Sequence, residues 1–265
     1  MHYAYSQEPP REQGSASNWH GYNDPSLVPM LSAAALMYRR GDVREATTTY
    51  VYDPGAEAFF GKATSAGNAP ALRMAAEKGR LLIAMPSTPA LPWLQRRAPA
   101  PGATVLTDPA QSLLPEGAQE VTSDTGELVR NWGRGIYTIN TARTQAALGW
   151  IGGSELRLPA VRLNLETRNV SVAVQSLDTA ALGQSSQVLI SIGTRSLPQP
   201  GHRAPFVVEP LAGRISVQAP PGLKAYRNGP FNQWIEVPVQ YQQGHYLLSL
   251  DGKLPVQWIV LRRAG

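Results

Sequence analysis

The sequence predicts a mainly β protein. Its larger part is expected to be an antiparallel β-sandwich, or a barrel-like relative, preceded by a small α/β segment with an N-terminal helix. Of the 265 residues, 24 are glycine and 23 proline while only 16% are charged, a composition typical of strands joined by turns. Short apolar stretches separated by turn residues also recur at roughly ten-residue spacing after Thr104.

Composition shifts divide the chain into three expected parts. Residues 1–23 are polar but contain six aromatic or histidine side chains, which predicts an extended aromatic arm. Residues 24–102 are expected to form the helix and a small α/β element, and residues 103–265 the sandwich. A chain of this length can bury a core without covalent cross-links, and it contains no cysteine.

The first regular element predicted is a helix from Asp24 to about Arg40. Asp24 can cap it, Pro25 suits its first position, and Gly41 can end it. The apolar side chains at a spacing of three to four residues are Leu27, Leu31, Ala34, Ala35 and Tyr38. We expect Leu27, Leu31 and Tyr38, together with Trp19 of the arm, to pack on a partner. Packing on a sheet of the same domain explains the pattern equally well.

The small α/β element is predicted from three consecutive segments. Residues 47–52 read as a strand, 69–79 as a helix and 80–85 as a buried strand. Four prolines then indicate that residues 86–102 form a loop or linker, which is a plausible boundary between the α/β segment and the sandwich.

Strands are expected throughout the rest of the chain. Residues 121–153 read as a β-hairpin, with a glycine-containing turn at 131–135 followed by alternation from Ile136. Later strands are expected at 155–165, 169–176, 187–193, 206–209, 214–218, 234–240, 245–250 and 257–261.

The turn of this hairpin is the best candidate for carbohydrate binding. Trp132 can present a flat indole to the apolar face of a sugar ring, and Arg130, Asn131 and Arg134 supply hydrogen-bond donors beside it. The alternative is that Trp132 packs on its own chain. Trp150 and Trp258 lie in apolar stretches and are interpreted as core residues.

Two stretches of the hairpin carry a family resemblance. They are SDTGE at 123–127 and GIYTINTARTQ at 135–145, and residues 172–178 and 188–191 fit the same pattern. They resemble the β-rich region that follows the (β/α)8 barrel of bacterial cellulase-like and β-galactosidase-like glycoside hydrolases. The resemblance implies an accessory region or subunit that packs on a catalytic barrel not contained in this chain and acts with it on a polysaccharide. The family's catalytic carboxylates have no matching positions here.

Glycoside hydrolysis needs two carboxyl groups about 5–5.5 Å or 6.5–9.5 Å apart. Asp124 and Glu127 are the nearest candidates by spacing, although a turn role for Asp124 and solvent exposure for Glu127 explain them as well. Three hypotheses therefore remain: an accessory glycosidase region without catalytic residues, a free-standing carbohydrate-binding module, and a complete small glycosidase.

Other functional classes have no support in the sequence. The four histidines lack metal-ligand spacing, and no nucleophile, phosphate or dinucleotide motif is present, so we expect neither metal nor cofactor. The 24 Lys and Arg are scattered, which argues against nucleic acid. No apolar run is long enough to span a membrane. An extracellular or periplasmic location is favoured if an export signal lies upstream.

Overall fold

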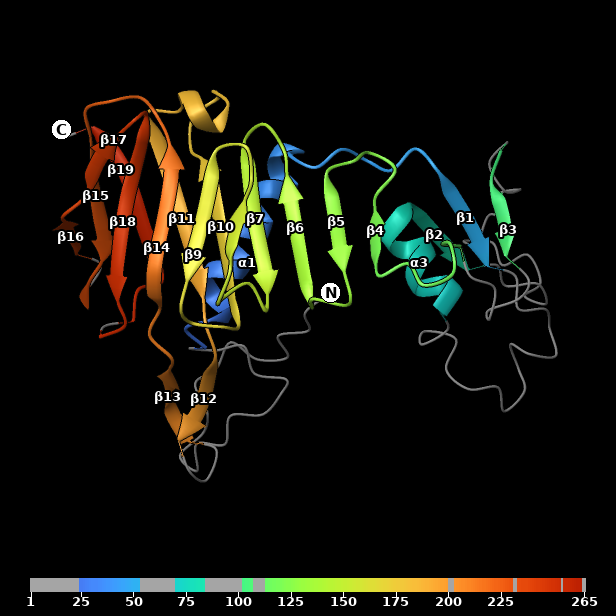
Figure 1. The fold of residues 1–265 in the computed structure, drawn as a ribbon, viewed down its shortest axis with the longest axis horizontal. Coiled ribbons are helices and arrows are strands. Elements are labelled where there is room, and N and C mark those ends of the chain that lie inside the picture. The colour runs from blue at the N-terminus through green and yellow to red at the C-terminus, as the bar shows by residue number, and fades with distance from the viewer. Residues whose placement is uncertain are drawn as a thin grey trace, which may run out of the picture. The chain divides into compact units, whose positions relative to one another are not determined.

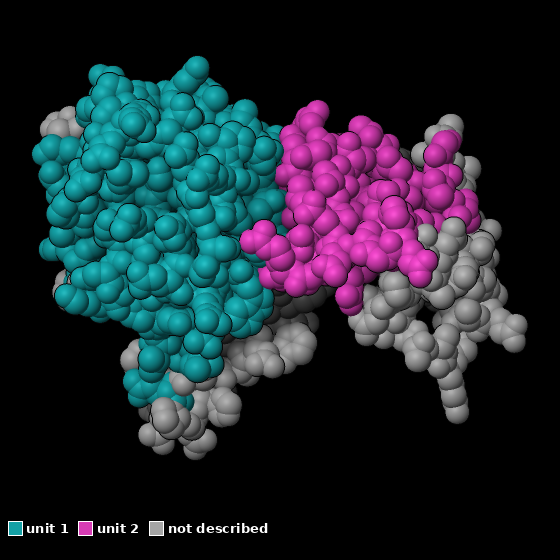
Figure 2. All heavy atoms as spheres, in the orientation of Figure 1, with its two compact units in different colours: residues 1–43, 136–265 teal, residues 44–135 magenta. Residues whose placement is uncertain are grey.

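The computed structural model describes residues 24–52, 70–83, 102–106, 113–199, 203–230, 233–253 and 255–263. The chain divides into two compact units, residues 1–43 with 136–265 and residues 44–135 (Figure 2). The predicted fold class is confirmed, because the structure is mainly β with antiparallel sheets and an N-terminal helix. The predicted arm with Trp19, and nearly all of the predicted linker, lie outside the described residues.

The larger unit contains two layers of antiparallel strands (Figure 1). In spatial order, the strands of the first layer are β16 (Trp234–Val237), β15 (Leu223–Asn228), β19 (Trp258–Arg263), β11 (Gln187–Gly193), β10 (Val170–Ser176), β7 (Thr144–Gly149) and β6 (Ile136–Asn140). Those of the second layer are β17 (Gln240–Gln242), β18 (His245–Asp251), β14 (Ala212–Gln218), β9 (Val161–Leu165) and β8 (Glu155–Arg157).

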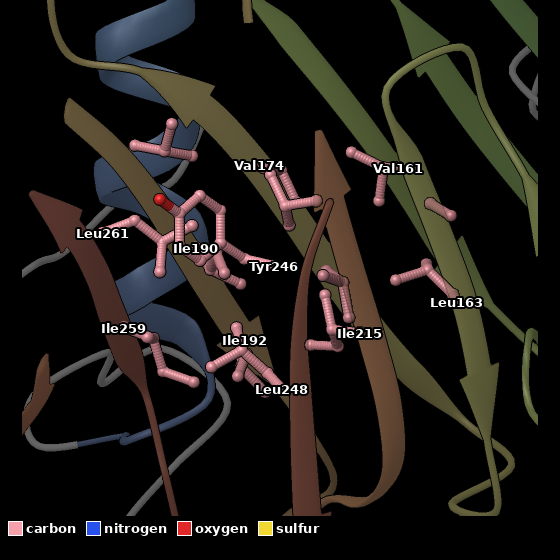
Figure 3. Packing of buried hydrophobic residues seen from close by; sticks show 14 of the residues in the cluster. Val161, Leu163, Val174, Ile190, Ile192, Ile215, Tyr246, Leu248, Ile259 and Leu261 are labelled. Atoms are coloured by element: carbon pink, nitrogen blue, oxygen red, sulfur yellow. The ribbon is translucent and has the colours of Figure 1, made fainter. Parts of the chain in front are cut away.

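The main core lies between these two layers. Along β9, Val161, Leu163 and Leu165 are buried and the residues between them are exposed, as expected for a strand with one face inward. Figure 3 shows Val161 and Leu163 with aliphatic side chains of both layers, including Val174, Ile190, Ile215, Leu248, Ile259 and Leu261. The phenolic O–H of the buried Tyr246 donates to the Pro220 carbonyl (2.8 Å), so its polar end is satisfied.

Helix α1 (Leu27–Arg40) covers the outer face of the first layer over β10 and β11 (Figure 1). Ala33 packs against Ala146 of β7 and Ala173 of β10, and these small side chains let the helix approach closely. Gly193 on β11 serves the same purpose, because a Cβ there would lie 2.8 Å from the Ser26 carbonyl oxygen. The first layer is thus covered on both faces near the helix, which explains why Thr144 to Ala147 of β7 are all buried.

A two-stranded ribbon also belongs to the larger unit. It consists of β12 (Ser196–Gln199) and β13 (Arg203–Val208), in which the exposed Leu197 and Val207 pair across the strands. Asp24 Oδ1 links α1 to this ribbon, since it accepts from the Ser196 hydroxyl (2.7 Å) while capping the Ser26 N–H (2.9 Å). A 3₁₀ turn, η2 (Leu182–Gln184), lies between β10 and β11.

The smaller unit contains the predicted α/β element. Strand β1 (Thr49–Tyr52) lies between two parallel neighbours, β2 (Arg80–Ile83) and β3 (Thr104–Leu106). Helix α3 (Pro70–Lys78) packs on them through a core that contains Tyr50, Tyr52, Leu72, Ala75 and Leu106. An antiparallel pair follows, β4 (Glu120–Thr122) with β5 (Leu128–Asn131).

Candidate functional site

The two candidate carboxylates, Asp124 and Glu127, lie in a turn of the smaller unit and bind it to a neighbouring segment. They lie between β4 and β5. Asp124 Oδ2 accepts from the backbone N–H groups of Thr47 (2.7 Å) and Thr48 (2.5 Å) and from the Thr47 hydroxyl (2.9 Å). Glu127 accepts from the Arg44 N–H (2.8 Å) and pairs with its guanidinium (2.9 Å). Both carboxylates therefore connect this turn to the segment before β1.

This arrangement does not suit acid–base catalysis. Burial tends to raise the pKa of Asp124, but hydrogen bonds from Thr48 and Thr47 outweigh it and lower that pKa. A glycosidase acid needs the opposite shift. The Glu127 side chain is only 13% exposed, so it is held by Arg44 rather than solvated as the sequence had suggested.

The predicted carbohydrate-binding residues surround the turn after β5. Asn131 Oδ1 accepts from the Arg134 N–H (2.8 Å), and Asn131 Nδ2 donates to Glu120 (3.1 Å). The backbone N–H of Trp132 donates to the Gln119 carbonyl (2.8 Å). Asn131 is thus occupied in shaping the turn.

Among the described residues, three buried polar atoms in this region lack a hydrogen-bond partner: the indole nitrogen of Trp132, Nε of Arg130 and Oε2 of Glu77 on α3. They are neighbours, because Arg130 and Trp132 both influence the Glu77 carboxyl. Burial raises the pKa of Glu77, and Arg130, Arg73 and the Trp132 N–H oppose this only in part. The indole N–H of Trp132 acts on Glu77 without forming a hydrogen bond of normal geometry.

Two donors and one acceptor without a partner are the kinds of group with which a hydroxyl can pair, since it accepts two hydrogen bonds and donates one. Sugars are rich in such groups. The three atoms are shielded from water, whereas Trp132 as a whole is half-buried. Sequence reasoning missed Glu77, because Arg73 and Glu77, four residues apart on one helix, resemble an ordinary surface pair.

The outward face of α1 is the second candidate surface, in the larger unit. Leu31 is 45% exposed, Tyr38 is 88% exposed and Leu27 is half-buried. At 100° per residue these three positions lie on the face opposite Ala33, which contacts the sheet. The apolar stripe seen in the sequence therefore points away from the sheet that α1 covers.

A fully buried carboxylate fixes the end of this helix to the sheet. Asp42, whose side chain is 0% exposed, pairs with Arg40 (2.6 Å) and with Arg143 (2.8 Å), and accepts from the Thr144 hydroxyl (2.7 Å). Arg40 also donates to the Ser176 carbonyl on β10. Each oxygen of Asp42 is therefore compensated, which makes such a buried charge tolerable.

Four further observations concern metal binding, membrane spanning, Trp150 and similarity to known proteins. In the described parts of the chain, no group of three or more potential ligands could hold a metal ion, and no described helix is long and apolar enough to cross a membrane. Trp150, interpreted as a core residue, is instead 57% exposed. No family, curated protein or solved structure matches this chain.

Proposed function

We propose that this chain is an accessory β-rich region of a glycoside hydrolase, which packs on a (β/α)8 catalytic barrel that the chain itself does not contain. The observation that carries the proposal is the outward apolar stripe of α1, made by Leu27, Leu31 and Tyr38. The helix that bears it is anchored by Asp42, so the stripe is presented on a fixed support. Large exposed apolar side chains that share one face mark interaction sites.

The position of the resembling residues supports the same proposal. Residues 135–145 include β6 and the start of β7, and residues 172–178 and 188–191 fall mainly on β10 and β11. These strands form the part of the sheet on which α1 lies. Apart from residues 123–127, which form the turn between β4 and β5 in the smaller unit, the resembling residues therefore lie mainly in the layer that supports the proposed contact.

The hydrogen bonds that already occupy the Asp124 and Glu127 carboxylates favour an accessory role for the chain over a complete small glycosidase. Each is bound to backbone N–H groups of the segment 44–48. If the chain hydrolysed glycosides alone, Glu127→Gln would abolish the activity. We expect the purified chain to have no such activity to lose.

The test is co-elution on a sizing column with the glycosidase barrel encoded beside or upstream of this region. We expect a complex with the unaltered chain and its loss in the Leu31→Ser/Tyr38→Ser variant. The matched control is Arg39→Gln, an exposed change on α1 away from the stripe, which should leave the complex intact. A complex that survives the double substitution would refute the proposed contact.

A second function, carbohydrate binding, is favoured by the unsatisfied cluster of Glu77, Arg130 and Trp132. On this proposal the chain is retarded on an insoluble polysaccharide column, and Trp132→Ala removes the retardation. Trp150→Ala is the matched control, because it deletes an exposed indole outside the cluster. Equal retardation of the unaltered chain and Trp132→Ala would exclude binding through this cluster.

A further inference from the structure

The larger unit contains a pocket of about 340 Å³ at one edge of its sandwich. This volume lies at the lower end of the range found for small-molecule sites. Both layers contribute to its walls, which are mostly aliphatic. They include Leu211, Val237, Val239, Leu250, Val256 and Ile259.

The pocket has a local cause in a strand that changes layers. β16 ends at Val237 in the first layer, and β17 begins at Gln240 in the second. Pro238 lies at the crossing, where it has no N–H to continue either ladder. The pairing of β17 with β18 stops at Gln240 and Leu247, although β18 continues to Asp251. Among the described strands, β18 beyond Leu247 therefore lacks a neighbour on this side, and these residues line the pocket.

An arginine lies on the inner face of this opening. Leu223 and Ala225 of β15 are buried in the core, and Arg227 follows with the same two-residue period. It is paired in register with Ile259, whose side chain is also in the core, and it lines the pocket. Charged residues are rare on the inner face of a sandwich unless they are paired.

Arg227 has no carboxylate partner among the described residues. Within the described part of the chain, its guanidinium makes one hydrogen bond, from Nη1 to the neighbouring Asn228 carbonyl at 3.3 Å. Asp251 also lines the pocket, but its carboxylate accepts from the Lys253 N–H (3.1 Å) and pairs with the Lys253 ammonium (3.6 Å). The guanidinium therefore keeps most of its five donors for another group.

We propose that this pocket binds a small organic anion with an aliphatic body. Its carboxylate is held by Arg227, which can offer two parallel N–H donors, and its hydrocarbon part lies against Val237, Val239 and Ile259. Among the described residues, the lining contains no aromatic ring on which a sugar could stack. The inference does not depend on the accessory function, because it concerns a different surface and a different ligand.

The test is isothermal titration of the unaltered chain with hexanoate, 1-hexanol and glucuronate. Hexanoate has both the carboxylate and the aliphatic body. Hexanol has the aliphatic body but lacks the charge, and glucuronate carries its carboxylate on a hydroxylated body. We expect hexanoate to bind most tightly. Absence of hexanoate binding, or glucuronate binding as tight as hexanoate, would overturn the proposal.

Variants of the pocket test the two parts of the site separately. Arg227→Gln should weaken hexanoate roughly tenfold, the effect expected for a lost charge-assisted hydrogen bond, and leave hexanol unchanged. Arg227→Lys should restore part of the loss. Val239→Phe should fill the pocket and abolish both interactions. Hexanoate affinity that is unaffected by Arg227→Gln in a normally folded variant contradicts the assignment of Arg227.

Discussion

Replacing Asp42 by asparagine should release α1 from its sheet. The carboxylate is completely buried and faces Arg40 at 2.6 Å, Arg143 at 2.8 Å and the Thr144 hydroxyl at 2.7 Å. Removing one partner of a buried ion pair costs about 3–5 kcal/mol, because the remaining charge loses its compensation. The Arg40 and Arg143 side chains remain 18% and 30% exposed, so water can solvate them in part. We therefore expect a loss of about 3 kcal/mol.

The assay is urea unfolding combined with hydrogen exchange of the α1 amides. The free energy of unfolding should fall in the transition that includes the larger unit, and exchange should accelerate in α1 before it does in the sandwich core. Glu45→Gln is the matched control. It neutralises an acid in the exposed Arg80–Glu45 pair, which should contribute less than about 1 kcal/mol. Equal effects of the two substitutions would refute the reasoning.

Three further predictions follow from individual contacts. Burial raises the pKa of Asp178, but hydrogen bonds led by the Ser186 N–H hold it at about 2, below its usual 3.8. The folded-state pKa is depressed, so Asp178 should contribute about 2 kcal/mol above pH 4 and lose it as pH falls towards 2. Unfolding of Asp178→Asn measured across this range should therefore differ from the unaltered chain at pH 7 and converge with it near pH 2. Gly213→Ala should destabilise the larger unit in thermal unfolding by more than about 1 kcal/mol, because φ is 125° and the added Cβ would lie 2.6 Å from a backbone oxygen of β9. Tyr246→Phe should cost about 1–2 kcal/mol in urea unfolding, since it leaves the buried Leu223 N–H and the half-buried Pro220 carbonyl without their hydrogen bonds.

The fold class could be predicted from the sequence because its helices and strands show clear hydrophobic periodicity and are bounded by capping and turn residues. The alternation in β9, the capped start of α1 and the strand–helix–strand order of the smaller unit can all be read locally. Two expected strands, 155–165 and 234–240, were wrong in the same way. Each contains a proline, Pro159 or Pro238, and the structure breaks each into two strands there.

The candidate surfaces were less accessible to sequence reasoning because they depend on long-range pairing. The apolar stripe of α1 was identified, but its period does not tell which face of the helix will pack on a sheet. In the structure, the face around the small side chain of Ala33 packs on the sheet. Asp42 meets Arg143 only after the chain has formed the sheet between them. Arg227 follows the inward period of β15, so alternation could have indicated its position, but not the missing partner.

The central claim is that the outward face of α1 contacts a catalytic barrel. Its most direct test is hydroxyl-radical footprinting of this chain with and without the glycosidase encoded beside it. Tyr38, which is 88% exposed, should lose its labelling in the complex, while Tyr241, which is 42% exposed and lies on β17, should keep it. Unchanged labelling of Tyr38 in a complex that has formed would contradict the claim.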